Sequence, residues 1–288
     1  MALIGGGGQL ASDLARSLNA ERLETFTHRQ LDITDATAVA RVLDAAAPDV
    51  VVNASGYNLV DQAEIEPEQA FAVNAFGVRN LARYCGQRGI ALVHVSTDYV
   101  FGGGDPRTTP FDESDSPHPL SAYGASKLAG EHFVRAECPR HLIVRTCGLY
   151  GLASTRAKSN FIETMLRLSE TRPEIRVVND QHCTPSFTTD VAQSIAALIG
   201  IDASGTYHVT NSGAATWYDL AAEVFRRAKR DVSLVPITSQ EFGAKARRPA
   251  YSVLDCSKLT AATGLVMPNW ADSVATYLMM REIRNRNP

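Results

Sequence analysis

Short apolar runs alternate with longer amphipathic stretches through the first half of the chain. Each of the first four runs is followed by a stretch with apolar residues at helical spacing, and a fifth closes the series; the runs are ALI, LETFT, DVVVNAS, ALVHVS and HLIVRT. Buried strands that alternate with helices form a parallel sheet covered on both faces. The pattern therefore predicts an α/β fold built on a doubly wound parallel sheet.

The alternation loosens after about residue 150. Further helices are predicted near NFIETMLRLSE, DVAQSIAALIG, WYDLAAEVFRRAK and WADSVATYLMMREI, and strands at EIRVVN and GTYHVT. We expect residues 1–150 to form the sheet domain and residues 151–288 to form mainly a smaller lobe, with some late elements returning to pack on the sheet. The loop from Gly102 to Pro119 is rich in Gly, Pro, Asp and Ser, and a loop of this length is often functional.

Composition and charge are those of an ordinary globular protein. Of the 288 residues, 45% are hydrophobic and 20% are charged, and the mean hydropathy is -0.11. The net charge of -3 offers no basic footprint for a nucleic acid, and the longest apolar runs are far shorter than a membrane span. We expect neither a nucleic-acid partner nor a membrane partner.

The chain has five cysteines, an odd number without a C-x-x-C pair. This pattern disfavours both a disulfide framework and a zinc site, and we expect no metal centre. The start, MALIGGGG, lacks the charged region and the long apolar region of a signal peptide. The expected location is the cytoplasm.

A glycine-rich turn follows the first predicted strand and opens the first helix. Its spacing is Gly5-x-x-Gly8-x-x-Ala11. Glycine there lets backbone N–H groups approach a pyrophosphate, whose charge lies at the positive end of the helix dipole. We expect this turn, together with Gln9 and Leu10, to bind a dinucleotide. The alternative is a flexible turn that only joins strand to helix.

The end of the second predicted strand bears on the choice of dinucleotide. NAD sites place a carboxylate there for the ribose hydroxyls, whereas a basic residue accommodates the 2′-phosphate of NADP. His28 and Arg29 stand at that point, which favours NADPH over NADH. The alternative is that Arg29 is a solvated loop residue. Asp32 is expected to cap its own turn or to contact the adenine.

Polar residues suited to proton transfer occupy two later segments. Thr97 and Asp98 follow the fourth predicted strand, and in open parallel sheets ligands bind at that carboxyl edge. Tyr123 and Lys127 lie in a predicted helix, where the i, i+4 spacing places both side chains on one face. A Tyr-x-x-x-Lys spacing is weak by itself, so its place after this strand is what indicates a site.

These segments together resemble the extended short-chain dehydrogenase/reductases, and among them the dTDP-4-dehydrorhamnose reductase family. The likeness covers nearly the whole chain and includes GGGGQLASDL, LDITD, PDVVVNASGYNLVDQAEIEPEQAFAVNAFGVRNLA, LVHVSTDYVFGG, PLSAYGASKLAGE, VVNDQHCTPSFTTDVA and ARRPAYSVLDCSKL. It implies an NAD(P)-binding Rossmann domain over residues 1–150 and a smaller C-terminal substrate lobe mainly over residues 151–288. The implied reaction uses NADPH, with NADH as the alternative, to reduce the C4 ketone of a nucleotide-linked 6-deoxyhexose, namely dTDP-4-dehydro-L-rhamnose, to dTDP-L-rhamnose.

The resemblance implies roles for the proton-transfer residues. Tyr123 would be the general acid, and Lys127 would bind the nicotinamide ribose and lower the pKa of that tyrosine. Thr97 would hydrogen-bond the substrate carbonyl, and Asp98 would be an accessory residue or a turn cap. Hydride transfer to a ketone creates an alkoxide that needs a proton, and a tyrosine with a pKa of about 10 is poorly matched to neutral pH. A nearby ammonium favours the phenolate.

The resemblance also implies contacts around this set. Beside the cofactor it places Asn53, Ala54, Ser55 and Tyr57. On the substrate side it adds Asn58, Val60, Tyr99, Gly148 and Arg248. The arginine suits a diphosphate because a guanidinium can donate two parallel hydrogen bonds. Trp217 is expected to pack within the lobe rather than to contact the sugar.

One position departs from the family pattern. Gly148, in RTCGLY, stands where the rhamnose enzymes have a tryptophan near the sugar, so we expect a more open pocket and leave the identity of the sugar open. Two alternatives follow: a ketoreductase for a related nucleotide sugar, and a non-catalytic module similar to the regulatory subunit of methionine adenosyltransferase. The expected small-molecule partner is a nucleotide sugar, and a homodimer is left open.

Overall fold

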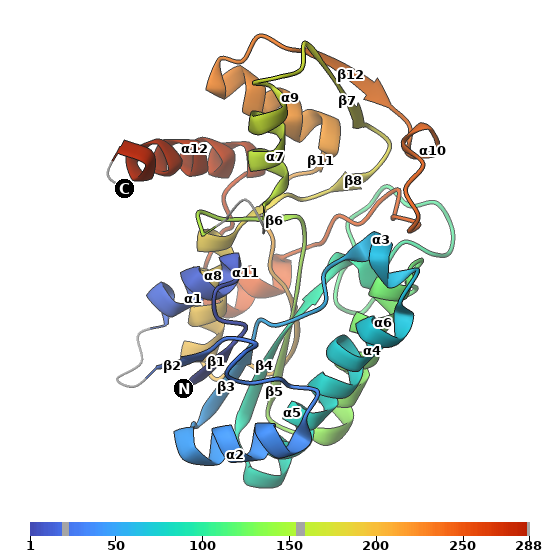
Figure 1. Ribbon diagram of the computed structural model, residues 1–288. Helices are drawn as coiled ribbons and strands as arrows, with labels where there is room; N and C mark the ends of the chain where they lie inside the picture. The colour runs from blue at the N-terminus through green and yellow to red at the C-terminus, as the bar shows by residue number, and fades with distance from the viewer. Residues whose placement is uncertain (19–22, 154–158, 287–288) are drawn as a thin grey trace.

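A parallel sheet of six strands forms the centre of the molecule (Figure 1). The computed structural model describes residues 1–18, 23–153 and 159–286. The strand order is β2-β1-β3-β4-β5-β10, and every neighbouring pair is parallel. The strands are β1 (Ala2–Ile4), β2 (Glu24–Phe26), β3 (Val50–Asn53), β4 (Ala91–Thr97), β5 (His141–Thr146) and β10 (Gly205–His208).

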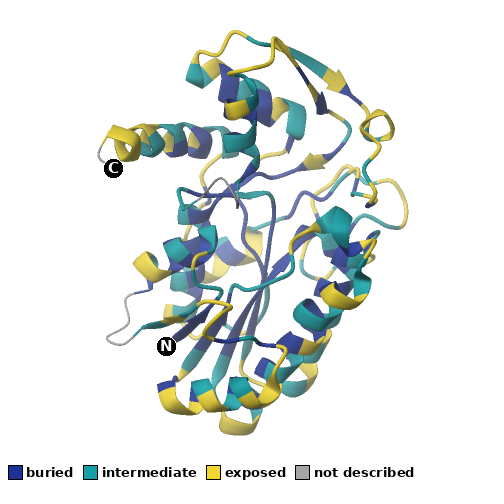
Figure 2. Cartoon of the chain, viewed as in Figure 1, coloured by how far each residue is buried: buried dark blue, intermediate teal, exposed yellow. Residues whose placement is uncertain are grey.

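The four central strands, β1, β3, β4 and β5, are buried on both faces, which explains their largely apolar sequences. The edge strand β2 has no buried residue. In β4, Val93 and Val95 belong to one core and Leu92 to the other. The first core is covered by α1 (Gln9–Ser17), α8 (Thr188–Gly200) and α11 (Ser257–Thr263), and the second by α2 (Ala36–Ala46), α5 (Val78–Arg88) and α6 (Ala122–Glu137). Figure 2 shows buried strands between helices whose outer faces are exposed. The predicted doubly wound sheet is confirmed.

The topology of the sheet marks one edge as the place for a ligand. The order puts β2 on one side of β1 and β3 on the other, so the winding reverses between β1 and β3. In open α/β sheets, ligands bind outside the carboxyl ends of the strands at such a switch point. The lobe stands above this edge of the sheet (Figure 1).

The lobe is built from most of the second half of the chain. Its helices enclose an apolar core in which Tyr150, Phe187 and Tyr277 contact one another through their rings. The helices are α7 (Phe161–Leu168), α9 (Trp217–Ala228), α10 (Ser239–Phe242) and α12 (Trp270–Arg286), and the paired strands are β7 (Glu174–Val178) with β12 (Ser233–Ile237), β6 (Leu149–Tyr150) with β9 (Ser186–Phe187), and β8 (His182–Cys183) with β11 (Ala215–Thr216). From the same half, α8 and β10 pack on the sheet instead.

The helical stretch after β3 is interrupted by a wider turn. α3 (Val60–Ala63) and α4 (Pro67–Phe71) are followed by a π-helical turn, Ala72–Gly77, which runs directly into α5. Turns of this kind are rare and occur often at functional sites. The turn carries Asn74, whose side chain is buried.

The loop from Gly102 to Pro119 is held by its own side chains. Arg107 Nη1 donates to Asp115 Oδ1 at 2.6 Å, and Phe111 stacks on Phe101 with ring centroids 4.2 Å apart. The loop packs Phe111 into a small core with Phe101 and Leu254, while more than half of its residues are exposed.

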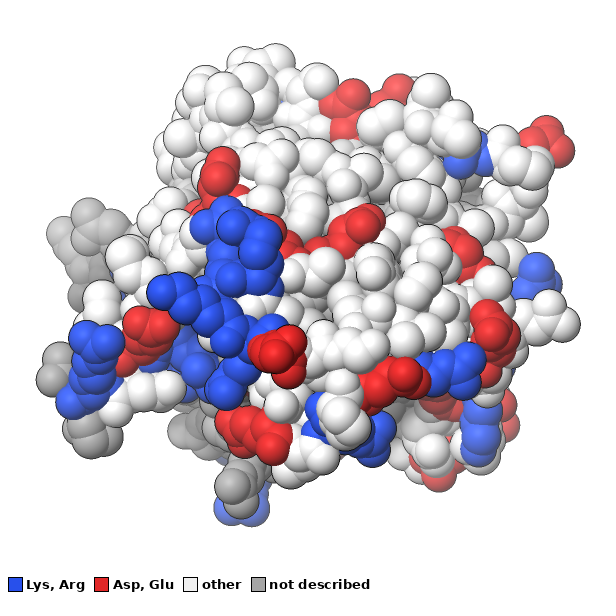
Figure 3. Space-filling model, turned by 90° about the horizontal axis from the view of Figure 1, so that it is seen from above, with Lys and Arg blue, Asp and Glu red and all other residues white. Residues whose placement is uncertain are grey.

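The face of the molecule on the lobe side carries charges of both signs. Figure 3 shows basic side chains gathered toward one side of this face, with acidic side chains among them. In the lobe, Arg281 pairs with Glu163 at 2.6 Å and Arg226 with Glu223 at 2.8 Å.

Among the described residues, no helix combines the length and the apolarity needed to cross a membrane.

Candidate active site

A cavity of about 330 Å³ opens at the carboxyl edge of the sheet. The ends of β1, β3, β4 and β5 and one face of α6 contribute to it. Its lining brings together most of the residues that the sequence indicated: Gly8, Gln9, Leu10, Ala54, Ser55, Asn58, Thr97, Asp98, Tyr123, Lys127 and Gly148. Residues from five separate segments therefore share one site.

The glycine turn lies at the switch point and is tightly packed against β3. Gly5 has φ +97°, and a Cβ there would lie 2.7 Å from the Ala54 carbonyl carbon and the Ser55 nitrogen. The N–H groups of Gly5 and Gly6 donate to Phe26 O at 3.0 and 2.9 Å. Only glycine fits this turn, and it leaves the start of α1 open toward the cavity, as a pyrophosphate site requires.

The side chains of the two residues after the turn have partners elsewhere in the chain. Gln9 Oε1 accepts from Gly151 N at 2.8 Å and from Asn160 Nδ2 at 2.9 Å, so this side chain ties α1 to the lobe. The Leu10 side chain is buried in the sheet core. Both residues also line the cavity at the start of α1.

The basic residues after β2 lie where the sequence places them. His28 and Arg29 are exposed in the turn that follows β2, two and three residues after the carbonyl of Phe26 that holds the glycine turn. Asp32 Oδ1 accepts from Thr34 N at 2.9 Å and from Thr34 Oγ1 at 2.8 Å, and these bonds lower its pKa. Asp32 therefore caps its own turn, which is one of the two roles predicted for it.

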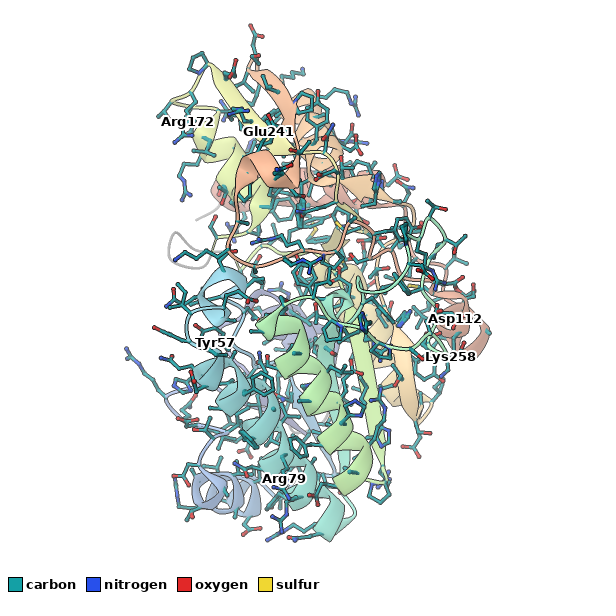
Figure 4. The ribbon with its side chains drawn as sticks, turned by 90° about the vertical axis from the view of Figure 1, so that its right-hand side faces the viewer. Tyr57, Arg79, Asp112, Arg172, Glu241 and Lys258 are labelled. Atoms are coloured by element: carbon teal, nitrogen blue, oxygen red, sulfur yellow. The ribbon has the colours of Figure 1, made fainter. Side chains whose placement is uncertain are left out.

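The loop after β3 is shaped by buried amides. Asn53 Oδ1 accepts from Ser55 N at 3.1 Å and from Ser55 Oγ at 2.6 Å, which folds this turn beside the glycines. Asn74, in the π-helical turn, accepts from Tyr57 N at 2.8 Å and donates to Tyr57 O at 3.0 Å. Figure 4 shows Tyr57 at mid-height, with the lobe that carries Arg172 and Glu241 above it.

Asn74 is a positioning residue that the sequence analysis missed. It also donates to Ser126 Oγ at 3.0 Å, and Ser126 Oγ donates to Tyr123 O at 2.7 Å. The loop carrying Tyr57 and the helix carrying Tyr123 are therefore fixed to each other. An asparagine within the apolar stretch AVNAFGV was the available indication.

Thr97 and Asp98 are buried at the end of β4. Thr97 Oγ1 donates to Asp98 Oδ1 at 3.1 Å and accepts from Tyr99 N at the same distance. Asp98 Oδ2 accepts from Ser252 Oγ at 2.6 Å, a partner that the sequence analysis did not single out. Burial raises the pKa of Asp98 to about 6, against the lowering effect of these hydrogen bonds.

Tyr123 and Lys127 occupy one face of α6, whose start is capped by Ser121 Oγ accepting from Gly124 N at 3.1 Å. Lys127 is 3% exposed, and its Nζ donates to Val95 O at 2.6 Å. Burial lowers the pKa of Lys127 to about 8, although Glu131 one turn later opposes this. Burial also raises the pKa of Tyr123. The expected lowering of that pKa is therefore not found in the free protein, because desolvation of the phenolate dominates.

A buried ion pair lies beneath this face of α6. Glu131 is fully buried and accepts from Arg145 Nε at 2.9 Å and Nη2 at 2.8 Å. It also accepts from Ser96 Oγ at 2.6 Å and from Arg135 Nη2 at 2.9 Å. These bonds join α6 to β4 and β5, and removing one partner would leave a buried charge unpaired.

The substrate-side residues lie between the cavity and the lobe. The rings of Tyr99 and Tyr123 meet edge to face with centroids 5.8 Å apart, and Val60 packs beside them. Arg248 donates to Asp61 from Nη1 at 3.1 Å and from Nη2 at 2.8 Å, so a carboxylate of α3 already orients its guanidinium. Arg248 also lines a second cavity, of about 580 Å³, within the lobe.

Gly148 lies on the wall of the first cavity, as expected, but its backbone has a constraint of its own. Its φ is +52°, and a Cβ there would lie 3.2 Å from Pro185 Cα and 3.6 Å from Trp217 Cη2. A side chain at this position would therefore start in a left-handed conformation against a proline. The family tryptophan is absent from position 148, and Trp217 lies close to that position instead.

Among the described residues, no group of three or more His, Cys, Asp or Glu side chains is arranged to hold a metal ion.

The fold and the geometry of the site define the class of the protein. A Rossmann sheet with Tyr123 and Lys127 one helical turn apart at its carboxyl edge is the arrangement of a short-chain dehydrogenase/reductase. The family model described as RmlD substrate binding domain matches residues 1–282. The chain belongs to this family, that of the dTDP-4-dehydrorhamnose reductases.

Similar proteins match over nearly the whole chain. The spore coat polysaccharide biosynthesis protein SpsK of Bacillus subtilis is 37% identical over 96% of each chain. The dTDP-4-keto-6-deoxy-D-glucose reductase of Streptomyces niveus is 42% identical, over 87% of this chain and 86% of that one. The solved dTDP-4-dehydrorhamnose reductase of Bacillus anthracis, in complex with NADP, is 38% identical with a TM-score of 0.91 and covers 97% of this chain and 98% of its own.

Proposed function

We propose that this protein reduces the C4 ketone of a dTDP-linked 6-deoxyhexose with NADPH, converting dTDP-4-dehydro-L-rhamnose to dTDP-L-rhamnose. One observation carries the proposal. Thr97, Tyr123 and Lys127 line the same cavity as the glycine turn that opens α1. A hydroxyl donor, a tyrosine and a lysine are thus grouped beside a site built for a dinucleotide.

The residues around the turn fit a phosphorylated dinucleotide. A Cβ on Gly5 would occupy the space against Ala54, and the open start of α1 suits a pyrophosphate. His28 and Arg29, exposed after β2, would hold a 2′-phosphate. The Bacillus anthracis relative was solved with NADP, which supports NADPH as the cofactor. When bound, the reduced nicotinamide supplies a hydride.

Proton transfer is assigned to the side chains of α6 and β4. Because burial raises the pKa of Tyr123, its hydroxyl keeps its proton until a strong base forms beside it. The alkoxide left by hydride addition is such a base, and the proton passes from the tyrosine oxygen to it. The Lys127 ammonium then stabilises the remaining phenolate. The Thr97 hydroxyl, which donates to Asp98 Oδ1 in the free protein, turns to donate to the substrate oxygen while charge develops.

The nucleotide end of the substrate is assigned to the lobe. The 580 Å³ cavity there has walls that include Phe161, Met165 and Trp217. Its polar lining residues include Gln181, Arg248, Arg172, Glu174 and Arg176. Apolar walls suit a base, and a guanidinium suits a diphosphate. Asp61 holds two of the nitrogens of Arg248 and so keeps the guanidinium oriented at the wall of this cavity.

The decisive experiment follows NADPH absorbance while the purified protein turns over dTDP-4-dehydro-L-rhamnose. We expect oxidation of NADPH and one dTDP-L-rhamnose formed per NADPH consumed. Tyr123→Phe serves as the matched control, because it keeps the ring and removes only the hydroxyl. A wild-type protein that binds NADPH but consumes none with this sugar would contradict the proposal.

A second candidate substrate is dTDP-4-keto-6-deoxy-D-glucose. It is supported by the 42% identity to the Streptomyces niveus reductase named for that sugar and by Gly148 in place of a tryptophan. Parallel assays with both ketosugars, with identification of each product, distinguish the two.

We further propose a cytoplasmic location, supported by five free cysteines, and a homodimer, which light scattering would test.

A further inference from the structure

The chain has two tryptophans, and one of them, Trp217, lines the lobe cavity and also comes close to Gly148, which lines the catalytic cavity. Trp217 is the first residue of α9, and a capping box fixes its backbone. Thr216 Oγ1 accepts from Asp219 N at 3.1 Å, and Asp219 Oδ2 accepts from Thr216 N at 2.9 Å. This doubly bonded helix start positions the indole with little freedom.

The indole packs against the lobe core and also lines the lobe cavity. Its ring meets that of Phe161 with centroids 4.9 Å apart at 45°, and the residue is only partly buried. Trp217 lines the lobe cavity together with Arg248 and Gln181. One surface of the indole thus supports the lobe core, and the rest faces the space that we assign to the substrate.

The far edge of the indole lies close to Gly148, a residue that lines the catalytic cavity. Trp217 Cη2 lies 3.6 Å from the point where a Cβ on Gly148 would be, which is van der Waals contact distance. Gly148 shares the catalytic cavity with Thr97 and Tyr123. Because glycine carries no side chain, the indole edge lies next to the backbone of that wall.

We infer that Trp217 is a specificity-determining residue whose indole edge contacts the hexose at Gly148 and selects its ring configuration. This inference rests on the proposed function. A nucleotide sugar with its ketone at Tyr123 and its diphosphate at Arg248 must extend from the catalytic cavity to the lobe cavity. Trp217 lines the second cavity and approaches Gly148 of the first, which places the hexose beside the indole. The left-handed backbone of Gly148 and the nearby Pro185 disfavour a wall built from residue 148 itself, so the indole from α9 provides it.

Selection by such a wall follows from its rigidity. The two candidate ketosugars contain the same atoms and differ in ring configuration, so only the shape of the pocket distinguishes them. An aromatic wall held by a capping box and by Phe161 cannot withdraw from a misplaced substituent. Apolar shape discrimination of this kind contributes on the order of ten-fold to two-hundred-fold in kcat/KM.

The first test compares Trp217→Leu with Trp270→Leu. Trp270 is the matched control, because it also begins a lobe helix, α12, but lies against Gly213 and lines neither of the two cavities. We expect Trp217→Leu to change the ratio of kcat/KM between dTDP-4-dehydro-L-rhamnose and dTDP-4-keto-6-deoxy-D-glucose by about ten-fold or more. Trp270→Leu should leave that ratio within about two-fold. An unchanged ratio in a folded Trp217→Leu protein would overturn the inference.

A second test needs neither turnover nor a variant of Trp217. Trp270→Phe leaves Trp217 as the single tryptophan. Its emission, excited selectively over that of the tyrosines, is followed during titration with dTDP and with dTDP-glucose in the absence of NADPH. We expect dTDP-glucose to change the emission beyond the change caused by dTDP, because only the former carries a hexose. Identical emission at saturation with both ligands would overturn the inference. If the wild type reduces neither ketosugar, the proposed function fails, and this titration still decides whether a hexose meets Trp217.

Discussion

Replacing Lys127 by methionine should make the folded protein more stable while it removes activity. Burial lowers the pKa of Lys127 from 10.5 to about 8. The ammonium therefore destabilises the folded protein at every pH at which Lys127 is protonated in both the folded and the unfolded state. A tenfold change in proton affinity equals about 1.4 kcal/mol, which gives a cost of about 3 kcal/mol at neutral pH. The lost hydrogen bond to Val95 O offsets about 1 kcal/mol of this. The expected gain is about 2 kcal/mol.

The gain should depend on pH in a definite direction. The folded-state pKa lies below the unfolded one, so the unfolded chain binds the proton more strongly. The cost is complete below pH about 8 and disappears as pH rises toward 10.5. The free energy of unfolding of the wild type should therefore approach that of Lys127→Met across this window. Urea unfolding at pH 7 and at pH 9.5, with exposed Lys245→Met as the control, measures both quantities.

Two outcomes would refute this reasoning. If Lys127→Met is less stable than the wild type at pH 7, the ammonium is stabilised by its partners and burial is not the dominant cause. If the stability difference stays constant between pH 7 and pH 9.5, Lys127 does not titrate there. The same variant should also bind NADPH more weakly and turn over slowly, because a ribose contact and a nearby positive charge are both lost.

Three further outcomes are expected. Tyr123→Phe should lower kcat on the order of a hundred-fold to ten-thousand-fold with NADPH affinity nearly unchanged, and a wild-type rate in a steady-state assay would remove it as the proton donor. Arg29→Ala should weaken NADPH binding more than NADH binding in a fluorescence titration, and equal losses would show that the exposed side chain does not meet a 2′-phosphate. Gly148→Ala should lower the free energy of unfolding by about 1 kcal/mol because φ is +52°, and an unchanged urea midpoint would contradict that strain.

The fold was predictable because the residue patterns that specify its strands and helices are local. Each strand of the sheet domain is a short apolar run, and each run was visible beside an amphipathic stretch with helical spacing. Where the local pattern carried less information, the structure differs in detail. The π-helical turn Ala72–Gly77 lies in a stretch that reads as ordinary helix, since one extra residue in a turn leaves the apolar pattern almost unaltered.

The site was predictable in its members and less so in their orientation. Tyr123, Lys127 and Thr97 were indicated by spacing and by their position at strand and helix ends, and they share one cavity. Gln9 was expected at the cofactor, but its amide bonds the lobe at Gly151 and Asn160. A motif specifies which backbone is present, whereas the direction of a side chain depends on the partners that the rest of the chain brings to it.

The sequence by itself therefore determined the sheet, the glycine turn and the helix that carries the proton-transfer pair, because each depends on residues within a few positions of one another. Only the tertiary structure decided which residues complete the site. Ser252 bonds Asp98 across 154 positions and Arg248 bonds Asp61 across 187, and the indole of Trp217 meets Gly148. These contacts exist because the lobe docks on the carboxyl edge of the sheet, and that docking is set by the summed burial of both halves rather than by any local pattern.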